Sequence, residues 1–222
     1  GHGGVDPGAS KSGIIEKDIT LKAARELRDY LKKYGHEVYL TRNKDVFLKL
    51  RERVKIAREK NADVFLSLHA DSVFNRSIRG MSVYTLSSKA SDRIARRLAR
   101  QADKADKISG IDLTEVDDEV GKILLDMSHR HTKNASAELA ESLVQGARKR
   151  GIRLLRRPHR QAGFAVLKAP DIPSILVEMG FLSNANDRDL LLKKSYRSEI
   201  IISLAEVLND YISNKLAKAQ SN

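Results

Sequence analysis

The chain has 222 residues, of which 41% are hydrophobic and 32% charged, and it carries a formal net charge of +12. This apolar content is sufficient for a packed core and excludes a wholly disordered chain. The absence of cysteine excludes a disulfide scaffold, a thiolate zinc finger, a thiol nucleophile and an iron–sulfur cluster. The length predicts a single domain, residues 1–222, and no apolar run approaches the roughly 20 residues that span a bilayer.

Helical and strand patterns alternate over the first part of the chain. Residues 13–34 have apolar side chains at helical spacing, and residues 47–60 predict a second, charged helix. Short strands are predicted at 37–41, 64–68 and 80–85, the middle one almost continuously apolar, as in a strand buried on both faces. This alternation predicts an α/β fold with a mostly parallel twisted sheet flanked by helices on both faces.

The pattern changes between residues 87 and 157. This stretch is polar, densely charged and helical over 88–107 and 116–149, which is longer than an ordinary connection between strands. We therefore expect a helical insertion within the single domain. The strand pattern resumes beyond it, and the remaining predicted elements are strands at 164–167 and 174–178 and a closing helix at about 188–216.

Three residues are placed to meet at one end of the sheet. His2 lies in a glycine-rich loop, Glu16 in the first turn of the first predicted helix, and His69 directly after the apolar strand at 64–68. In open α/β sheets, ligands bind beyond the carboxyl ends of the strands. Two histidines and one carboxylate are typical of catalytic zinc, with the fourth position open.

Taken singly, these residues have simpler explanations. A histidine in a glycine-rich loop is usually solvated, and an acid at a helix N-terminus interacts favourably with the helix dipole. His69 is harder to explain this way, because a polar ring directly after an apolar strand needs a partner. His129 and His131 are spaced i,i+2, which puts them on different helix faces and makes them poor joint ligands.

Glu178 ends the apolar strand at 174–178, the same kind of position that His69 occupies. It is either an exposed strand-end residue or a carboxylate near the metal. In the second case it is placed to take a proton from water as a general base and to return it as an acid. The residues alone therefore favour metal-assisted hydrolysis.

Several motifs along the whole chain stand in the order found in one enzyme family, and they are residues 1–4 with 6–9, 16–18, 41–42, Arg53, 62–72, 173–178 and 180–184. The chain closely resembles the zinc-dependent N-acetylmuramoyl-L-alanine amidases of the bacterial cell-division type. This resemblance implies one Zn²⁺ ion held by His2, Glu16 and His69, with Glu178 as the catalytic carboxylate. The implied reaction is cleavage of the amide between N-acetylmuramic acid and the L-alanine of peptidoglycan stem peptides.

The resemblance also gives the insertion a meaning. In amidases of this type a helical insertion covers the active site, and an activator with a LytM-type domain displaces it. An acidic residue of the insertion can occupy the zinc. By ungapped alignment this chain has Ala102-Asp103 where similar proteins have Glu-Asn, so we expect Asp103, or secondly Asp106, as an inhibitory metal contact.

The resemblance further implies a role in cell-wall remodelling and daughter-cell separation. It also implies a periplasmic location, and we expect a monomer. The chain opens on Gly1-His2-Gly3-Gly4, without a signal peptide, and we expect an exported fragment whose leader has been removed.

The basic run between Arg148 and Arg160 leaves an alternative open. It fits either a solvated helix end or contact with the carboxylates of peptidoglycan, and charge alone also fits a nucleic-acid-binding protein. We expect no nucleic acid partner, because aromatic residues do not alternate with the basic ones as stacking platforms require. A wall-binding module without activity and an enzyme for another amide are further alternatives. The presence of all four site residues argues against an inactive module, and the motif order argues against an enzyme for another amide.

Overall fold

The computed structural model describes residues 1–107 and 119–220, without the side chains of residues 105–129, 216 and 218–220. The first elements are β1 (Ser10–Lys11), β2 (Ile14–Ile15), α1 (Glu16–Lys33), α2 (Leu50–Glu59), β3 (Phe65–His69) and β4 (Met81–Leu86). They are followed by α3 (Arg93–Lys107), α4 (Glu119–Lys149), β5 (Leu154–Ala162), the 3-10 helix η1 (Ala165–Leu167), β6 (Ser174–Glu178), α5 (Ala185–Leu192) and α6 (Lys194–Gln220).

Four strands form one sheet in the order β3-β6-β4-β5. The β3–β6 and β4–β5 pairs are parallel, and β4 runs antiparallel to β6. The register aligns His69 with Glu178, and Glu178 with Ser82 at the start of β4. The carboxyl ends of β3 and β6 therefore lie side by side, and the prediction of an α/β fold with a mostly parallel sheet is confirmed.

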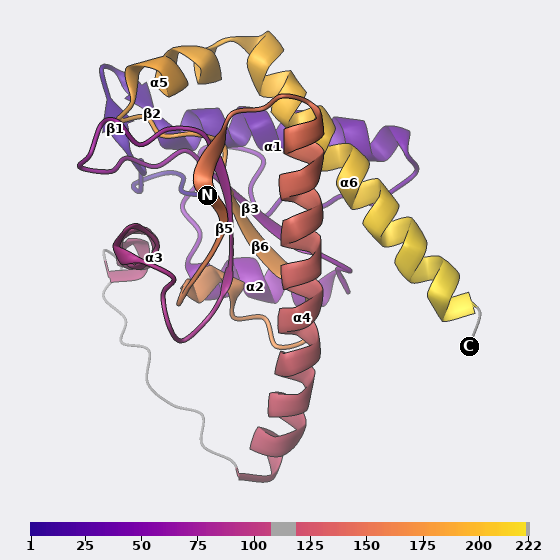
Figure 1. The fold of residues 1–222 in the computed structure, drawn as a ribbon. Helices are drawn as coiled ribbons and strands as arrows, with labels where there is room; N and C mark the ends of the chain where they lie inside the picture. Colours follow the sequence, from indigo (N-terminus) through magenta and orange to yellow (C-terminus); the bar gives the residue numbers. More distant parts are fainter. Residues whose placement is uncertain (108–118, 221–222) are drawn as a thin grey trace.

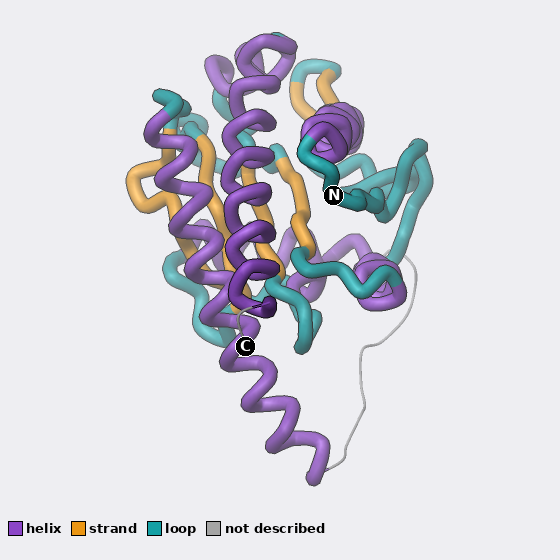
Figure 2. The backbone as a smooth tube through the Cα atoms, turned by 90° about the vertical axis from the view of Figure 1, so that its right-hand side faces the viewer, coloured by secondary structure: helices purple, strands orange, loops and turns teal. Residues whose placement is uncertain are grey.

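Helices cover both faces of this sheet, which lies between two helical layers (Figures 1 and 2). Apolar residues of α1, α4 and α6 form one core with Ile175 and Val177 of β6, while α2 and α3 form the other with Leu176. This alternation along β6 follows from the two-residue period of a strand. A strand buried on both faces reads as a continuous apolar run, which is why the sequence predicted β6 correctly.

Helix α1 carries the first metal-ligand candidate into the fold. Its buried residues Ile19, Ala23, Leu27 and Leu31 recur every four positions and so form one apolar face. Glu16 and Asp18 lie in the first turn of the helix and two lysines lie in its last turn, which suits the helix dipole. Glu16 is therefore the first residue of a helix fixed to the sheet along its length.

Two of the strand predictions are wrong, and one strand was not predicted. Residues 37–41 form no strand, and a cavity of about 310 Å³ is lined both by this segment and by the edge strand β3. Residues 164–167, predicted as a strand, mostly form the 3-10 helix η1. The sheet instead includes β5, whose basic sequence was not predicted as a strand; arginines and Pro158 are tolerated there because β5 is an edge strand.

The region between residues 87 and 157 contains two different parts. The N-terminal half of α4 projects beyond the rest of the molecule (Figure 1). By contrast, its C-terminal half is core, since Leu139, Leu143 and Ala147 are 0% exposed. The Asp106 side chain lies outside the described residues. No helix in the described ranges is long and apolar enough to cross a bilayer.

The substitution Leu143→Ala tests this division of α4. We expect it to lower the free energy of unfolding by about 2–5 kcal/mol, because it leaves a cavity in a closed core. Leu192→Ala is the control, since that side chain is 54% exposed, and we expect it to cost less than about 1 kcal/mol. Equal costs in urea unfolding would show that this half of α4 is not core.

Candidate metal centre

His2 lies in a tight loop with an unusual backbone. Its φ is 59°, in the left-handed region. L-residues seldom adopt this conformation, because it costs about 1 kcal/mol or more. Gly3 and Asp6 close the loop through two backbone hydrogen bonds, of 2.8 and 3.1 Å. At Gly8, a Cβ would lie 2.6 Å from both Glu16 Oε2 and the His2 ring, so only glycine permits this approach.

Two buried arginines hold this loop in place. Arg53 of α2 donates from Nη2 to the carbonyl oxygen of His2 at 3.0 Å. Arg42 donates from Nη2 to the carbonyl oxygens of Gly1, at 3.0 Å, and Lys17, at 2.7 Å. Because Lys17 follows Glu16 in α1, Arg42 joins the loop of His2 to the helix that carries Glu16. The arginines thus fix the relative position of two metal-ligand candidates.

The carboxylate of Glu16 is completely buried, with 0% exposure, and both of its oxygens have partners. Oε2 accepts a hydrogen bond from the backbone N–H of Ala9 at 2.8 Å, and Oε1 accepts one from that of Ala70 at 2.9 Å. Oε1 also lies 3.0 Å from Nδ1 of His69, and Oε2 lies 3.2 Å from Nε2 of His2. Glu16 therefore connects the two histidines.

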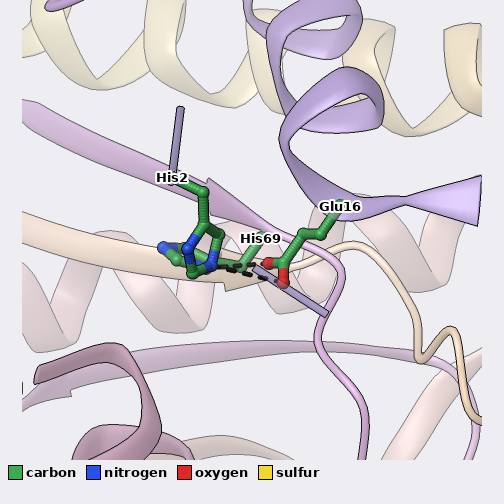
Figure 3. Close-up of side chains that lie close together, drawn as sticks. All are labelled: His2, Glu16 and His69. Atoms are coloured by element: carbon green, nitrogen blue, oxygen red, sulfur yellow. Dashed lines mark hydrogen bonds and ion pairs between the residues drawn. The ribbon is translucent and has the colours of Figure 1, made fainter. Parts of the chain in front are cut away.

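His2, Glu16 and His69 form the group that the sequence predicted (Figure 3). One donor atom from each lies within 4.8 Å of the others. Nε2 of His2 is buried and makes no hydrogen bond, although Nδ1 of the same ring lies 2.7 Å from Asp6. Metal-binding histidines typically use one ring nitrogen for the metal and the other for a hydrogen bond to a carboxylate, and His2 has this arrangement. The hydroxyl of Ser67 lies 3.1 Å from Nε2 of His69, while Nδ1 of the same ring faces Glu16.

The charged forms of His2 and Glu16 stabilise each other. Burial alone would lower the pKa of His2, but the Glu16 carboxylate and the hydrogen bond to Asp6 raise it to about 9. Burial alone would raise the pKa of Glu16, but the two histidines hold it well below its usual range. Burial lowers the pKa of His69 to about 3, so this ring is neutral at pH 7. An ionised carboxylate surrounded by imidazoles is a donor set suited to a divalent cation.

Glu178 lies beside this group and is 1% exposed, which excludes the interpretation of a solvated strand end. Its Oε2 accepts a hydrogen bond from the backbone N–H of Asp71 at 3.0 Å. Burial, with the nearby charges of Asp71 and Glu16, raises the pKa of Glu178 well above its usual value. A carboxyl group in such surroundings readily holds a proton, as a general base and acid must.

Asp103 is not brought to this group. Its Oδ1 accepts a hydrogen bond from the backbone N–H of Ala165 at 3.0 Å, at the start of η1. The α3 residue that reaches the site is Gln101, which donates from Nε2 to Asp71 Oδ1 at 2.7 Å. Two residues along a helix turn a side chain by about 200°, so Gln101 and Asp103 point to opposite sides of α3.

Sequence reasoning missed the supporting residues around the site. Asp6, Ser67 and Asp71 stand within four positions of a predicted ligand, so their proximity along the chain was a usable signal. Arg53 stood among the family motifs but without an assigned role. Gln101 lacks any such signal, since only folding brings it from a distant helix to the site.

Comparison with known proteins gives one consistent result. The family model described as N-acetylmuramoyl-L-alanine amidase, Amidase_3, matches residues 1–210. N-acetylmuramoyl-L-alanine amidase AmiC of Neisseria meningitidis is 39% identical over 224 residues, which cover 98% of this chain but 52% of that protein. AmiA of Escherichia coli is 36% identical over 213 residues, covering 95% of this chain and 73% of that protein.

A solved structure shows the same fold. The CwlD amidase from Clostridioides difficile, in complex with the GerS lipoprotein, superposes with a TM-score of 0.71 at 23% identity. The match covers 96% of this chain and 95% of that one.

The substitution Arg53→Ala tests whether the arginines maintain the centre. We expect it to weaken Zn²⁺ binding about 10- to 100-fold, as losses of outer-sphere contacts do, because the His2 loop is released. Affinity is measured by competition with a chromogenic chelator. Arg51→Ala is the control, since Arg51 is an exposed residue of the same helix, and its affinity should match that of the parent. Unchanged affinity in Arg53→Ala would contradict a positioning role.

Proposed function

The chain belongs to the Amidase_3 family of N-acetylmuramoyl-L-alanine amidases, and on that premise we propose that it cleaves the amide between N-acetylmuramic acid and L-alanine in peptidoglycan. The observation that carries the proposal is the buried group of His2, Glu16 and His69 beside Glu178. Since the chain spans 52% of one such relative and 73% of another, the substrate is part of the proposal.

We propose that His2, Glu16 and His69 hold one Zn²⁺ ion. Such an ion, when bound, polarises the scissile carbonyl and stabilises the negative charge that develops on its oxygen. The protein contributes the fixed geometry of the ligands. Asp6 and Ser67 orient the histidine rings, and backbone N–H groups orient Glu16.

Glu178 is our proposed general base and general acid. It takes a proton from the water whose oxygen attacks the carbonyl carbon, and it returns this proton to the nitrogen of the departing L-alanine. The carbon–nitrogen bond then breaks, leaving a carboxylic acid on the lactyl group and a free amine on the peptide. The N–H of Asp71 holds one oxygen of Glu178 in place during both transfers.

The biological setting is part of the same proposal. The resemblance to cell-division amidases supports a role in wall remodelling and daughter-cell separation. Peptidoglycan lies outside the cytoplasmic membrane, and we therefore propose that the enzyme works in the periplasm.

We also propose that α3 restrains the enzyme. The supporting contact is the hydrogen bond from Gln101 to Asp71, because Asp71 holds Glu178. A ligand contact by Asp103 would require it to leave Ala165 and α3 to turn, so in the described arrangement Gln101 makes the inhibitory contact. A LytM-type activator that moves α3 would break the contact. CwlD, a structural neighbour, forms a complex with another protein, GerS.

Digestion of purified peptidoglycan tests the activity. The parent should release stem peptides with a free N-terminal L-alanine, identified by mass spectrometry, and a zinc chelator should stop the release. Glu178→Gln should lower the rate by about 10²–10⁴-fold, the contribution of a general base, while Zn²⁺ content stays the same. Glu138→Gln, at an exposed position of α4, is the control. A Glu178→Gln enzyme with full activity would refute the assigned role.

The variant Gln101→Ala tests the restraint. Loss of a hydrogen bond to a carboxylate, about 1.5–3 kcal/mol, should free α3 and raise the basal rate by about fivefold or more. Gln145→Ala, on the exposed face of α4, should leave the rate unchanged. If the rate of Gln101→Ala stays at or below that of the parent, the contact does not inhibit.

A further inference from the structure

Helix α3 carries a cationic stripe along its exposed side. Its members recur at intervals of three, four and seven residues, which puts them on one arc of the helix. The opposite arc packs into the core through Ala95, Leu98, Ala99 and Ala102. All members of the cationic stripe are exposed, and they are Arg93, Arg96, Arg97, Arg100 and Lys104.

The side chains of the stripe form no ion pair or hydrogen bond with the described residues. Other arginines of the chain do, since Arg150 pairs with Glu199 and Glu206, and Arg160 pairs with Asp92. Like charges at i,i+3 and i,i+4 repel and destabilise a helix. Both this repulsion and the unpaired charge are relieved by an anionic ligand.

A surface cavity lies along one side of the stripe. It has a volume of about 530 Å³ and is lined by Arg96 and Arg100 of α3 and by Lys89 of the preceding loop. Small residues, among them Ala99, Ala162 and Gly163, form other parts of its lining. One carboxylate, Asp103, also lines it, but its Oδ1 accepts a hydrogen bond from the Ala165 N–H. The cavity therefore presents three cations against one acid.

The other side of the stripe borders the catalytic centre. Gln101, at the edge of the cationic arc, donates a hydrogen bond to Asp71, and the backbone N–H of Asp71 holds Glu178. A polymer whose scissile bond lies at Glu178 thus passes next to α3. From Arg93 to Lys104 the stripe is about 16 Å long, at 1.5 Å per residue, which suits several anionic groups in a row.

We propose that the cationic stripe binds carboxylates of peptidoglycan stem peptides that neighbour the one being cleaved. This inference rests on the proposed function, because it takes peptidoglycan as the substrate. Arginine suits the ligand, since its planar guanidinium pairs with a carboxylate through two parallel hydrogen bonds. The stripe has no aromatic side chain on which a nucleic acid base could stack.

Cosedimentation with insoluble peptidoglycan tests the proposal. All proteins carry Glu178→Gln so that the polymer stays intact. Replacing Arg93, Arg96 and Arg100 by glutamine should raise the Kd about tenfold or more. Replacing them by lysine should raise it less, because lysine keeps the charge but not the two parallel hydrogen bonds. The matched control replaces Lys22, Lys32 and Lys33 by glutamine, three exposed cations of α1. The control should bind as its parent does.

A second arm changes the polymer instead of the protein. Peptidoglycan whose carboxyl groups have been converted to amides should bind the parent as weakly as native polymer binds the glutamine variant. Equal binding to native and amidated polymer would overturn the proposal. So would equal losses in the stripe and control variants, or tighter binding of the parent to duplex DNA or anionic lipid vesicles.

Two measurements separate this inference from the proposed function. Thermal unfolding of the glutamine variant checks that the protein still folds. If that variant does not fold, the lysine variant, which keeps the positive charges, is compared with the parent instead. Release of L-alanine peptides by the chain with Glu178 intact reports the function alone. If binding depends on the stripe but no L-alanine peptides are released, the binding proposal is supported and the proposed reaction is refuted.

Discussion

The burial of one carboxylate organises the site. Glu16 is 0% exposed, and an ionised carboxylate in such a place costs several kcal/mol unless it is fully paired. Two backbone N–H groups and two imidazoles provide that pairing. These partners come from two segments, residues 2–9 and residues 69–70, so the requirement to pair Glu16 brings the His2 loop, the start of α1 and the end of β3 together.

The sheet explains why Glu178 lies beside this group without joining it. Parallel pairing aligns Glu178 with His69 on the adjacent strand, and the N–H of Asp71 fixes its carboxylate. The same face of the sheet packs against α2 and α3, which supply Arg53 on one side of the centre and Gln101 on the other. One helix thus stabilises the ligand loop, while the other reaches the residue that holds the base.

Helix α3 combines contacts of three kinds through the geometry of a helix. Its buried arc joins the core, its Gln101 edge contacts Asp71, and the arc between Gln101 and Asp103 carries the cationic stripe. Because these surfaces belong to one rigid element, movement of α3 changes all of them together. The proposed restraint and the proposed binding of neighbouring stem peptides are in this way physically linked.

The sequence by itself determined the α/β class, most helices, the buried strands β3 and β6, and the group of His2, Glu16 and His69. These features follow from local periodicity and from the rule that the ends of buried strands share one edge of a sheet. It predicted a strand at 37–41 that is absent and missed β5, because the pairing of an edge depends on what lies beside it. Only the tertiary structure decided that Arg53 holds His2, that the C-terminal half of α4 is core, and that Gln101 rather than Asp103 reaches the site. Such contacts join residues far apart in the chain, and the direction of a side chain around a helix has meaning only once the helix has been packed.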